Sequence, residues 1–140
     1  MAEPKVAIII STYNQEKLLE ETINSLKKKT SYKNYKIILV DDASEKKIGE
    51  KIRKKFKGTD VIVNEKNKGF SGANNVGIKY ALQKYSPDYF LLLNDDMNIL
   101  DRNWLSRLIS VGEDEPQTGI LGAQVLYPDG ELQNIGNNIK

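Results

Sequence analysis

Two adjacent carboxylates, Asp95 and Asp96, directly follow a short apolar run at residues 89–93, extended by one amide at Asn94. A run this short and this rich in leucine and aromatic residues is typical of a strand buried on both faces. Unpaired acids are too costly to bury inside such a strand, so we expect them at its carboxyl end, where open α/β sheets bind ligands. Carboxylate oxygens suit Mg²⁺ and Mn²⁺. The pair therefore predicts a divalent-cation site that a phosphorylated substrate would complete.

Polar residues also follow the other expected strands of the first half of the chain. They occupy residues 11–14, 41–44 and 64–65, and join the group at 94–96. The carboxyl ends of parallel strands meet at one edge of a sheet, so we expect these four groups to lie close together. Their convergence is the main functional signal in the chain.

Each polar group also has a purely structural interpretation. Asn14, Asp42 and Ser44 are good helix N-caps, and Asp95 with Asp96 could form a turn. Gly69 and Gly72 could simply permit the positive φ of a turn, because a glycine-rich loop alone is a weak phosphate signal. The functional hypothesis depends on the four groups together.

The apolar periodicity predicts the elements that position these residues. Expected strands are 6–10, 35–40, 61–63, 89–93 and 120–127; expected helices are 15–29 capped by Asn14, one after Ser44 stopped at Gly58, one from about Gly72 to Gln83, and one around 104–109. Pro128, Asp129 and Gly130 signal a turn towards a partner strand near Leu132. The alternation predicts an α/β fold with a mostly parallel, doubly wound sheet and helices on both faces.

Composition narrows the chemistry of this single expected domain, residues 1–140. The chain has no histidine and no cysteine, which excludes Ser-His-Asp triads, histidine bases and zinc sites built on these residues. A net charge of +2 does not indicate nucleic-acid binding, and the lysines at 27–29 fit the end of a helix. No segment approaches the roughly 20 apolar residues of a membrane span. We expect a cytoplasmic protein, with peripheral association at the inner face of the membrane left open.

Four motifs in order and spacing resemble those of family 2 glycosyltransferases with the GT-A fold, a Rossmann-like architecture. They are Ser-Thr-Tyr-Asn at 11–14, Val-Asp-Asp-Ala-Ser at 40–44, the segment 67–78, and Leu-Leu-Asn-Asp-Asp at 92–96. The segment Gly-Ala-Asn-Asn-Val-Gly-Ile at 72–78, with Tyr-Pro-Asp-Gly-Glu-Leu-Gln at 127–133, is most similar to the rhamnosyltransferase-like branch. This resemblance implies a part in polysaccharide biosynthesis.

The resemblance implies inverting transfer of a sugar from a nucleotide-diphosphate sugar to a hydroxyl of a saccharide or lipid-linked acceptor. A UDP- or dTDP-sugar is the donor that we expect first. It implies that Asp41 accepts a hydrogen bond from a pyrimidine ring, and that Asp96, with Asp95 second, binds Mn²⁺ or Mg²⁺. Asn94 stands in place of the first acid of the family's Asp-x-Asp motif. The donor-binding residues expected in this way are Thr12, Tyr13, Asn14, Asp41, Asp42, Asn67, Gly69, Asn75, Asn94 and Asp95.

The resemblance also implies a carboxylate base in the second half of the family's domain, which binds the acceptor. The chain stops soon after Leu132, with no stable element expected over 134–140. We therefore expect a truncated domain, assign no catalytic base, and expect the 140-residue chain to bind donor while transferring little or no sugar.

The main alternative is a receiver domain that binds Mg²⁺ and is phosphorylated on an aspartate, because residues 39–42 and 94–97 imitate its acidic sites. A receiver needs no strand–helix unit before these acids, and needs a lysine after a later strand, where this chain has Tyr127 and Pro128. A nicotinamide-binding domain is disfavoured because no glycine fingerprint follows the first strand. A binding module without chemistry stays open for this chain alone.

Overall fold

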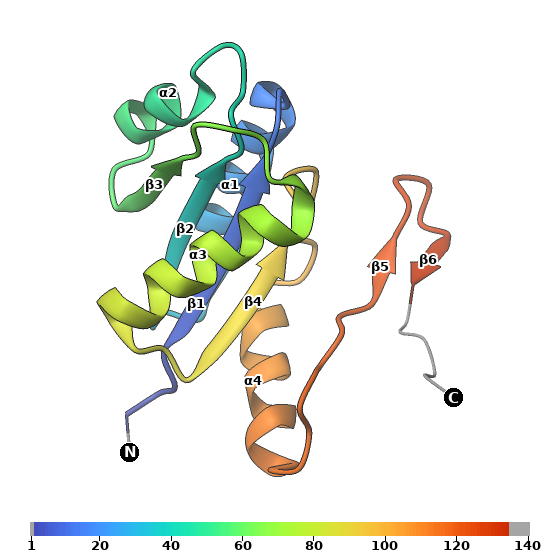
Figure 1. Ribbon diagram of the computed structural model, residues 1–140. Helices are drawn as coiled ribbons and strands as arrows, with labels where there is room; N and C mark the ends of the chain where they lie inside the picture. The colour runs from blue at the N-terminus through green and yellow to red at the C-terminus, as the bar shows by residue number, and fades with distance from the viewer. Residues whose placement is uncertain (1, 135–140) are drawn as a thin grey trace.

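Short runs rich in isoleucine, valine and leucine form a parallel β-sheet in the computed structural model, which describes residues 2–134. The strand order is β3-β2-β1-β4, so β1 lies between β2 and β4 (Figure 1). The strands are β1 (Val6–Thr12), β2 (Tyr35–Asp41), β3 (Thr59–Val63) and β4 (Tyr89–Leu93). Thr12 pairs with Asp41, and Ile10 pairs with Leu93, so the carboxyl ends of these strands meet at one edge.

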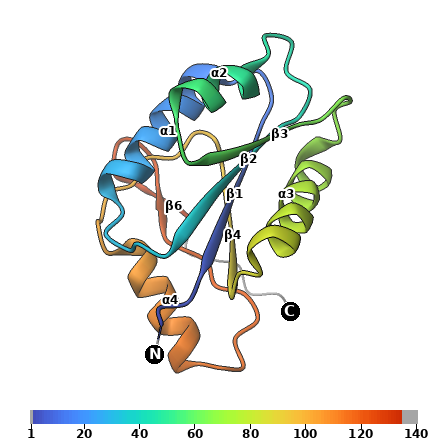
Figure 2. The ribbon, with the colours of Figure 1, turned by 90° about the vertical axis from the view of Figure 1, so that its left-hand side faces the viewer.

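Helices cover both faces of this sheet, as the sequence predicted. On one face lie α1 (Glu16–Lys29), α2 (Ile48–Lys55) and α4 (Trp104–Asp114), and on the other lies α3 (Gly69–Tyr85) (Figure 2). The larger core joins Ile8 and Ile10 of β1 to α1, α2 and α4, while Ala7, Ile9 and Ile38 face α3. Alternate residues of β1 therefore serve the two layers.

A glycine brings α3 unusually close to the sheet. A Cβ atom added at Gly77 would lie 2.5 Å from Cγ2 of Ile9 and 3.1 Å from Cγ2 of Val40. Both distances are shorter than ordinary carbon–carbon contacts, so only a hydrogen atom fits there. This close approach sets the height of α3 above β1 and β2, and with it the place of the first turn of the helix at the carboxyl edge.

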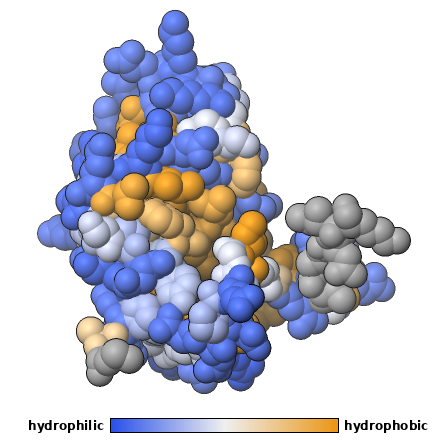
Figure 3. All heavy atoms as spheres, turned by 60° about the horizontal axis from the view of Figure 1, so that its bottom comes forward, coloured by the Kyte–Doolittle hydropathy of each residue, from blue (hydrophilic) through white to orange (hydrophobic). Residues whose placement is uncertain are grey.

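The expectation that β4 is buried on both faces is wrong. Within residues 2–134 it is an edge strand, and Phe90 and Leu92 on one of its faces are 40% and 50% exposed. The alternate residues of β4 pack against the larger core, but α3 lies over β1 and β2 and leaves the opposite face open. A space-filling view shows apolar side chains reaching the molecular surface (Figure 3). An apolar run reports the hydrophobicity of a strand, not whether a neighbour covers it.

Two expected helix caps are also wrong. Helix α1 begins after Gln15 and α2 after Lys47, and neither has a side-chain cap. Asn14 takes a positive φ of 58°. Its amide oxygen accepts a hydrogen bond from the N–H of Glu45 (3.0 Å), and its own N–H donates to Oγ of Ser44 (3.0 Å). The two predicted caps therefore tie the loops after β1 and β2 to each other.

Helix α3 begins at Gly69, earlier than the expected start near Gly72, and continues to Tyr85. Gly69 has a φ of 70°, which agrees with its structural interpretation as a residue at a turn. The earlier start brings the first turn of α3 within reach of the residues that follow β1 and β2.

The expected strand at 120–127 is shorter than predicted. It is present only as β5 (Val125–Leu126), which pairs antiparallel with β6 (Leu132–Asn134), and the predicted turn joins them with Gly130 at a φ of 89°. This hairpin stands apart from the parallel sheet (Figure 1). The expectation of no stable element over residues 134–140 is wrong at Asn134, which ends β6, and its remainder lies outside the described part of the chain. Every helix within residues 2–134 is too short or too polar to span a bilayer.

At the end of α3 remote from its first turn, one carboxylate connects this helix to β3. Oδ2 of Asp60 accepts hydrogen bonds from the hydroxyls of Tyr80 (3.1 Å) and Tyr85 and from Nζ of Lys84 (3.0 Å). Burial on its own would raise the pKa of Asp60, but the hydrogen bonds from Tyr85, Lys84 and Tyr80 outweigh it and hold the pKa below its ordinary value of 3.8. The folded protein therefore favours the charged carboxylate.

We expect Asp60→Asn to lower the free energy of unfolding at neutral pH by about 1 kcal/mol, because the site is partly exposed and the lost bonds are charge-assisted. Since the folded-state pKa is depressed, this contribution is fully present above pH 3.8 and is lost as pH falls through the folded-state value. Urea unfolding at neutral and acidic pH measures it, with the exposed Asp114→Asn as control. A deficit that is the same at both pH values would contradict this account.

Candidate functional site

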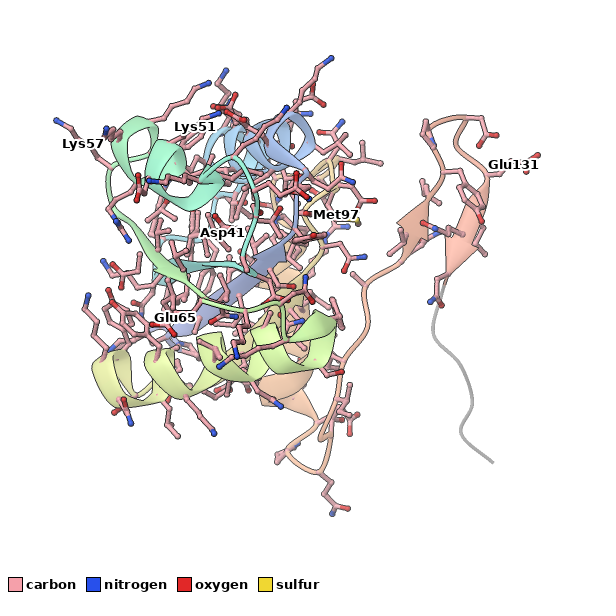
Figure 4. All side chains as sticks on the ribbon, turned by 45° about the horizontal axis from the view of Figure 1, so that its top comes forward. Asp41, Lys51, Lys57, Glu65, Met97 and Glu131 are labelled. Atoms are coloured by element: carbon pink, nitrogen blue, oxygen red, sulfur yellow. The ribbon has the colours of Figure 1, made fainter. Side chains whose placement is uncertain are left out.

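A hollow of about 310 Å³ lies at the carboxyl edge of the sheet, where β1, β2 and β4 end beside the first turn of α3. It is lined by Ser11, Thr12, Tyr13, Gln15, Asp42, Asn67, Gly69, Phe70, Ala73 and Asp95. Two labelled residues in Figure 4 help to locate the lining acids. Asp41 precedes Asp42 in the chain, and Met97 lies two residues after Asp95. Three of the four predicted polar groups thus contribute to one concave surface.

A second hollow, of about 360 Å³, lies between the first turn of α1 and residues 45–48. It contains Asn14, together with acids and lysines such as Glu16, Lys17, Glu45 and Lys46. The loops after β1 and β2 reach it, but no residue that follows β4 lines it, and it contains neither Asp42 nor Asp95. We take the hollow at the carboxyl edge as the functional site.

Asp42 organises the wall of the site that α3 provides. Its side chain is only 3% exposed. Oδ1 accepts hydrogen bonds from Nδ2 of Asn64 (2.7 Å) and the N–H of Lys68 (2.9 Å), and Oδ2 also accepts from Lys68 (3.0 Å). Its backbone carbonyl accepts from Nδ2 of Asn67 (3.3 Å). A carboxylate at the positive end of a helix is favourable, so Asp42 both fixes the loop and stabilises the start of α3.

Asp41 lies away from the hollow, and its expected role at the nucleoside stays a prediction. This residue is 0% exposed and does not line the hollow. Its two carboxylate oxygens accept hydrogen bonds from backbone N–H groups, those of Ser44 (3.0 Å) and Gly49 (2.7 Å). Successive side chains of a strand point to opposite faces, so Asp41 turns towards α2 while its neighbour Asp42 reaches the site. Adjacent acids in a sequence do not reveal which one faces a ligand.

The acids after β4 differ in their surroundings. Oδ2 of Asp95 accepts a hydrogen bond from Oγ1 of Thr12 (2.7 Å), and Asp95 lines the hollow. Burial and, to a lesser degree, the charge of Asp96 raise the pKa of Asp95, although the bond from Thr12 acts in the opposite direction. Asp96 and Asn94 are exposed beside it, outside the lining. Of these two acids, Asp95 is the one that lines the hollow, and the role of Asp96 as the first-ranked metal ligand stays a prediction.

The donor atoms here fit a hard divalent cation. Asp95 and Asp96 offer carboxylate oxygens and Asn94 offers an amide oxygen, all of the type that Mg²⁺ and Mn²⁺ prefer. Within residues 2–134, no group of three or more Asp, Glu, His or Cys side chains could hold a metal by itself. Any cation bound here would take its remaining ligands from water or from substrate.

The other predicted site residues divide into two sets. Thr12, Tyr13, Asn67 and Gly69 line the hollow, whereas Asn75 is exposed on α3 outside it and Asn14 lies in the second hollow. Sequence reasoning did not single out Gln15, and it included Ser11, Phe70 and Ala73 only as members of the motifs at 11–14 and 67–78. A signal was present for Ala73, since it follows Gly69 by one helical turn. Phe70, a large aromatic that is 60% exposed, is recognisable only once its place at the mouth of the site is known.

Comparison with known proteins agrees with this architecture. The family model described as glycosyl transferase family 2 matches residues 7–138. The O-antigen biosynthesis protein RfbC of Myxococcus xanthus is 27% identical over 135 residues, which cover 95% of this chain and 10% of that protein. An uncharacterized glycosyltransferase of Haemophilus influenzae is 28% identical over 141 residues, covering 98% of this chain and 42% of that protein. The chain thus spans less than half the length of these relatives.

Solved structures with the same fold include residues 1–349 of S. aureus TarS in complex with UDP. That protein is 29% identical, with a TM-score of 0.63 over 80% of this chain and 33% of its own. The mannosyltransferase PcManGT of Pyrobaculum calidifontis, in complex with GDP-Man and Mn²⁺, is 17% identical with a TM-score of 0.65 over 92% of this chain and 37% of its own. This second likeness shows the GT-A fold alone. Because the family model covers nearly all of the chain, the chain belongs to glycosyl transferase family 2.

Proposed function

We propose that this chain is the donor-binding part of a glycosyltransferase, and that it holds a nucleotide-diphosphate sugar together with a divalent cation in the hollow at the carboxyl edge. The observation that carries the proposal is the convergence of Thr12, Asp42 and Asp95, from three different strand ends, on one concave surface. The complexes of TarS with UDP and of PcManGT with GDP-Man and Mn²⁺ support it.

The charge of the lining explains why a cation is needed. Among its ten residues, Asp42 and Asp95 are acidic and none is basic. A diphosphate brought against two carboxylates would be repelled unless a cation lay between them. When bound, the cation supplies Lewis-acid stabilisation of the charge that develops on a departing nucleoside diphosphate. We propose Asp96 as its first protein ligand and Asp95 as the second, with Asn94 beside them.

The aromatic residues that line the hollow suit the nucleoside. Tyr13 and Phe70 are exposed aromatic side chains at its mouth, and an aromatic face can stack on a base. Asn67 offers an amide, and Asp42 takes the place expected of Asp41 as the acceptor for a base N–H. We assign no general base to this chain, because the resemblance implies a carboxylate base in the second half of the family's domain and both acids of the lining have other roles in this proposal.

The finer features of the function are proposals as well. The motifs favour a UDP- or dTDP-sugar, a saccharide or lipid-linked acceptor, and a rhamnosyltransferase-like role in polysaccharide biosynthesis; the relation to RfbC supports the last of these. Inverting transfer, a cytoplasmic location and peripheral contact with the membrane are proposed on the same basis. The match to the glycosyltransferase family over residues 7–138 disfavours the receiver alternative.

Thermal unfolding with a ligand panel tests the function. We expect Mn²⁺ with one of UDP, dTDP or GDP to stabilise the chain, by about 2.7 kcal/mol when the ligand is at 100 times its dissociation constant. NAD, and acetyl phosphate with Mg²⁺, should leave the melting temperature unchanged. In the same assay, Asp96→Ala should abolish the part of the shift that depends on Mn²⁺, whereas Glu131→Ala on the distant hairpin (Figure 4) should not. The proposal fails if no nucleoside diphosphate has an effect.

The two buried acids at the end of β2, Asp41 and Asp42, provide a matched pair of variants. We expect Asp42→Asn and Asp41→Asn each to cost about 1–3 kcal/mol of stability, because both acids accept backbone hydrogen bonds. Only Asp42→Asn should also weaken binding of the nucleoside diphosphate, measured by calorimetry on the folded protein. Weaker binding by Asp41→Asn alone would instead restore Asp41 to the nucleoside pocket.

A further inference from the structure

A buried threonine on α1 bridges the main chain on both sides of Asp96. Thr22 is 1% exposed. Its Oγ1 donates a hydrogen bond to the backbone carbonyl of Asp95 (2.9 Å) and accepts one from the N–H of Met97 (2.9 Å). Thr22 does not line the hollow. Both hydrogen-bonding functions of a hydroxyl are therefore used on the turn that carries the two acids.

The next turn of α1 continues this connection. Oγ of Ser25 accepts a hydrogen bond from the N–H of Ile99 (2.8 Å) and donates to Oδ1 of Asn98 (2.7 Å). Residues three apart lie on the same side of a helix, so Thr22 and Ser25 face the segment that follows β4 together. Ile99 is itself buried in the larger core. The turn of the acids is thus fastened to α1, an element that supplies no ligand.

Thr12 completes the arrangement from β1, because it fixes the side chain of Asp95. The result is asymmetric. The main chain on either side of Asp96 and the carboxylate of Asp95 are held by hydroxyls, whereas the Asp96 carboxylate is exposed and makes no hydrogen bond with another residue of the described range 2–134. A carboxylate that has no partner of its own, but whose backbone is already fixed, is suited to binding a cation because binding costs little conformational entropy.

We propose that Thr22 is a positioning residue for the cation-binding acids: its hydroxyl sets the geometry of the Asp95–Met97 turn and thereby the affinity of the site for a divalent cation. This inference rests on the proposed function. Groups that orient metal ligands from the second layer typically change metal affinity by about 10–100-fold when they are lost. Threonine at this position is therefore more than a residue that fills the interface between α1 and β4.

Three variants separate positioning from general stability. Thr22→Val keeps the shape but removes the hydroxyl, Thr22→Ser restores it, and Thr30→Val is the matched control. Thr30 is also a buried threonine at α1, 4% exposed, and its Oγ1 accepts a hydrogen bond from Nε1 of Trp104 (3.0 Å) far from the acids. Electron paramagnetic resonance of free Mn²⁺, in the presence of UDP, gives the dissociation constant of each folded variant. Hydrogen exchange reports on the Met97 amide without any ligand.

We expect Thr22→Val to raise the Mn²⁺ dissociation constant about 10–100-fold and to speed exchange of the Met97 amide. Thr22→Ser and Thr30→Val should bind Mn²⁺ as the wild type does, even if Thr30→Val melts earlier. Wild-type affinity in Thr22→Val, or an equal loss in Thr30→Val, overturns the inference and leaves the proposed function intact. Failure of the wild type to bind Mn²⁺ with UDP, dTDP or GDP overturns the proposed function, and the inference with it.

Discussion

The pairing of β1 with a parallel neighbour on each side is the constraint on which the rest of the structure depends. Because Thr12 pairs with Asp41 and Ile10 with Leu93, the residues that follow three strands reach the same edge. A shift of one residue in either pairing would turn Asp42 or Asp95 to the other face. The buried isoleucines of β1 enforce the register, since such a slip would disturb both cores at once.

Sequence reasoning anticipated the features of the fold that follow from the periodicity of apolar residues. It missed those that depend on which elements lie next to each other in space. The alternation of apolar runs was sufficient for the parallel sheet, for helices on both faces and for most of the polar residues at its edge. It could not tell that β4 lies at the edge of the described sheet, because Phe90 and Leu92 are as apolar as buried residues. Nor could it tell that Asp42 rather than Asp41 lines the hollow, that Asn14 bonds to Ser44 and Glu45 rather than capping α1, or that Thr22 reaches Asp95 and Met97 from another element.

Hydrogen bonds within the protein occupy some acids at the carboxyl edge of the sheet and leave another available to a ligand. The Asp41 carboxylate accepts hydrogen bonds from backbone N–H groups, and Asp42 stabilises the start of α3 while it faces the hollow. The Asp95 carboxylate accepts a hydrogen bond from Thr12. Asp96 alone among them is exposed and without such a bond in the described part of the chain. A surface with this concentration of negative charge and no basic lining residue is poorly suited to a diphosphate by itself and well suited to a diphosphate with a cation.

Paramagnetic broadening of backbone amide signals by Mn²⁺, with Mg²⁺ as the diamagnetic reference and UDP present in both samples, tests this central claim most directly. The account predicts broadening centred on residues 94–97, extending to 12–13 and 67–70, with the signals of residues 53–57 at the far end of α2 and of the hairpin at 129–133 unaffected. Broadening centred on the hollow that contains Asn14, Glu16 and Glu45, or spread evenly over the acidic surface, would contradict it.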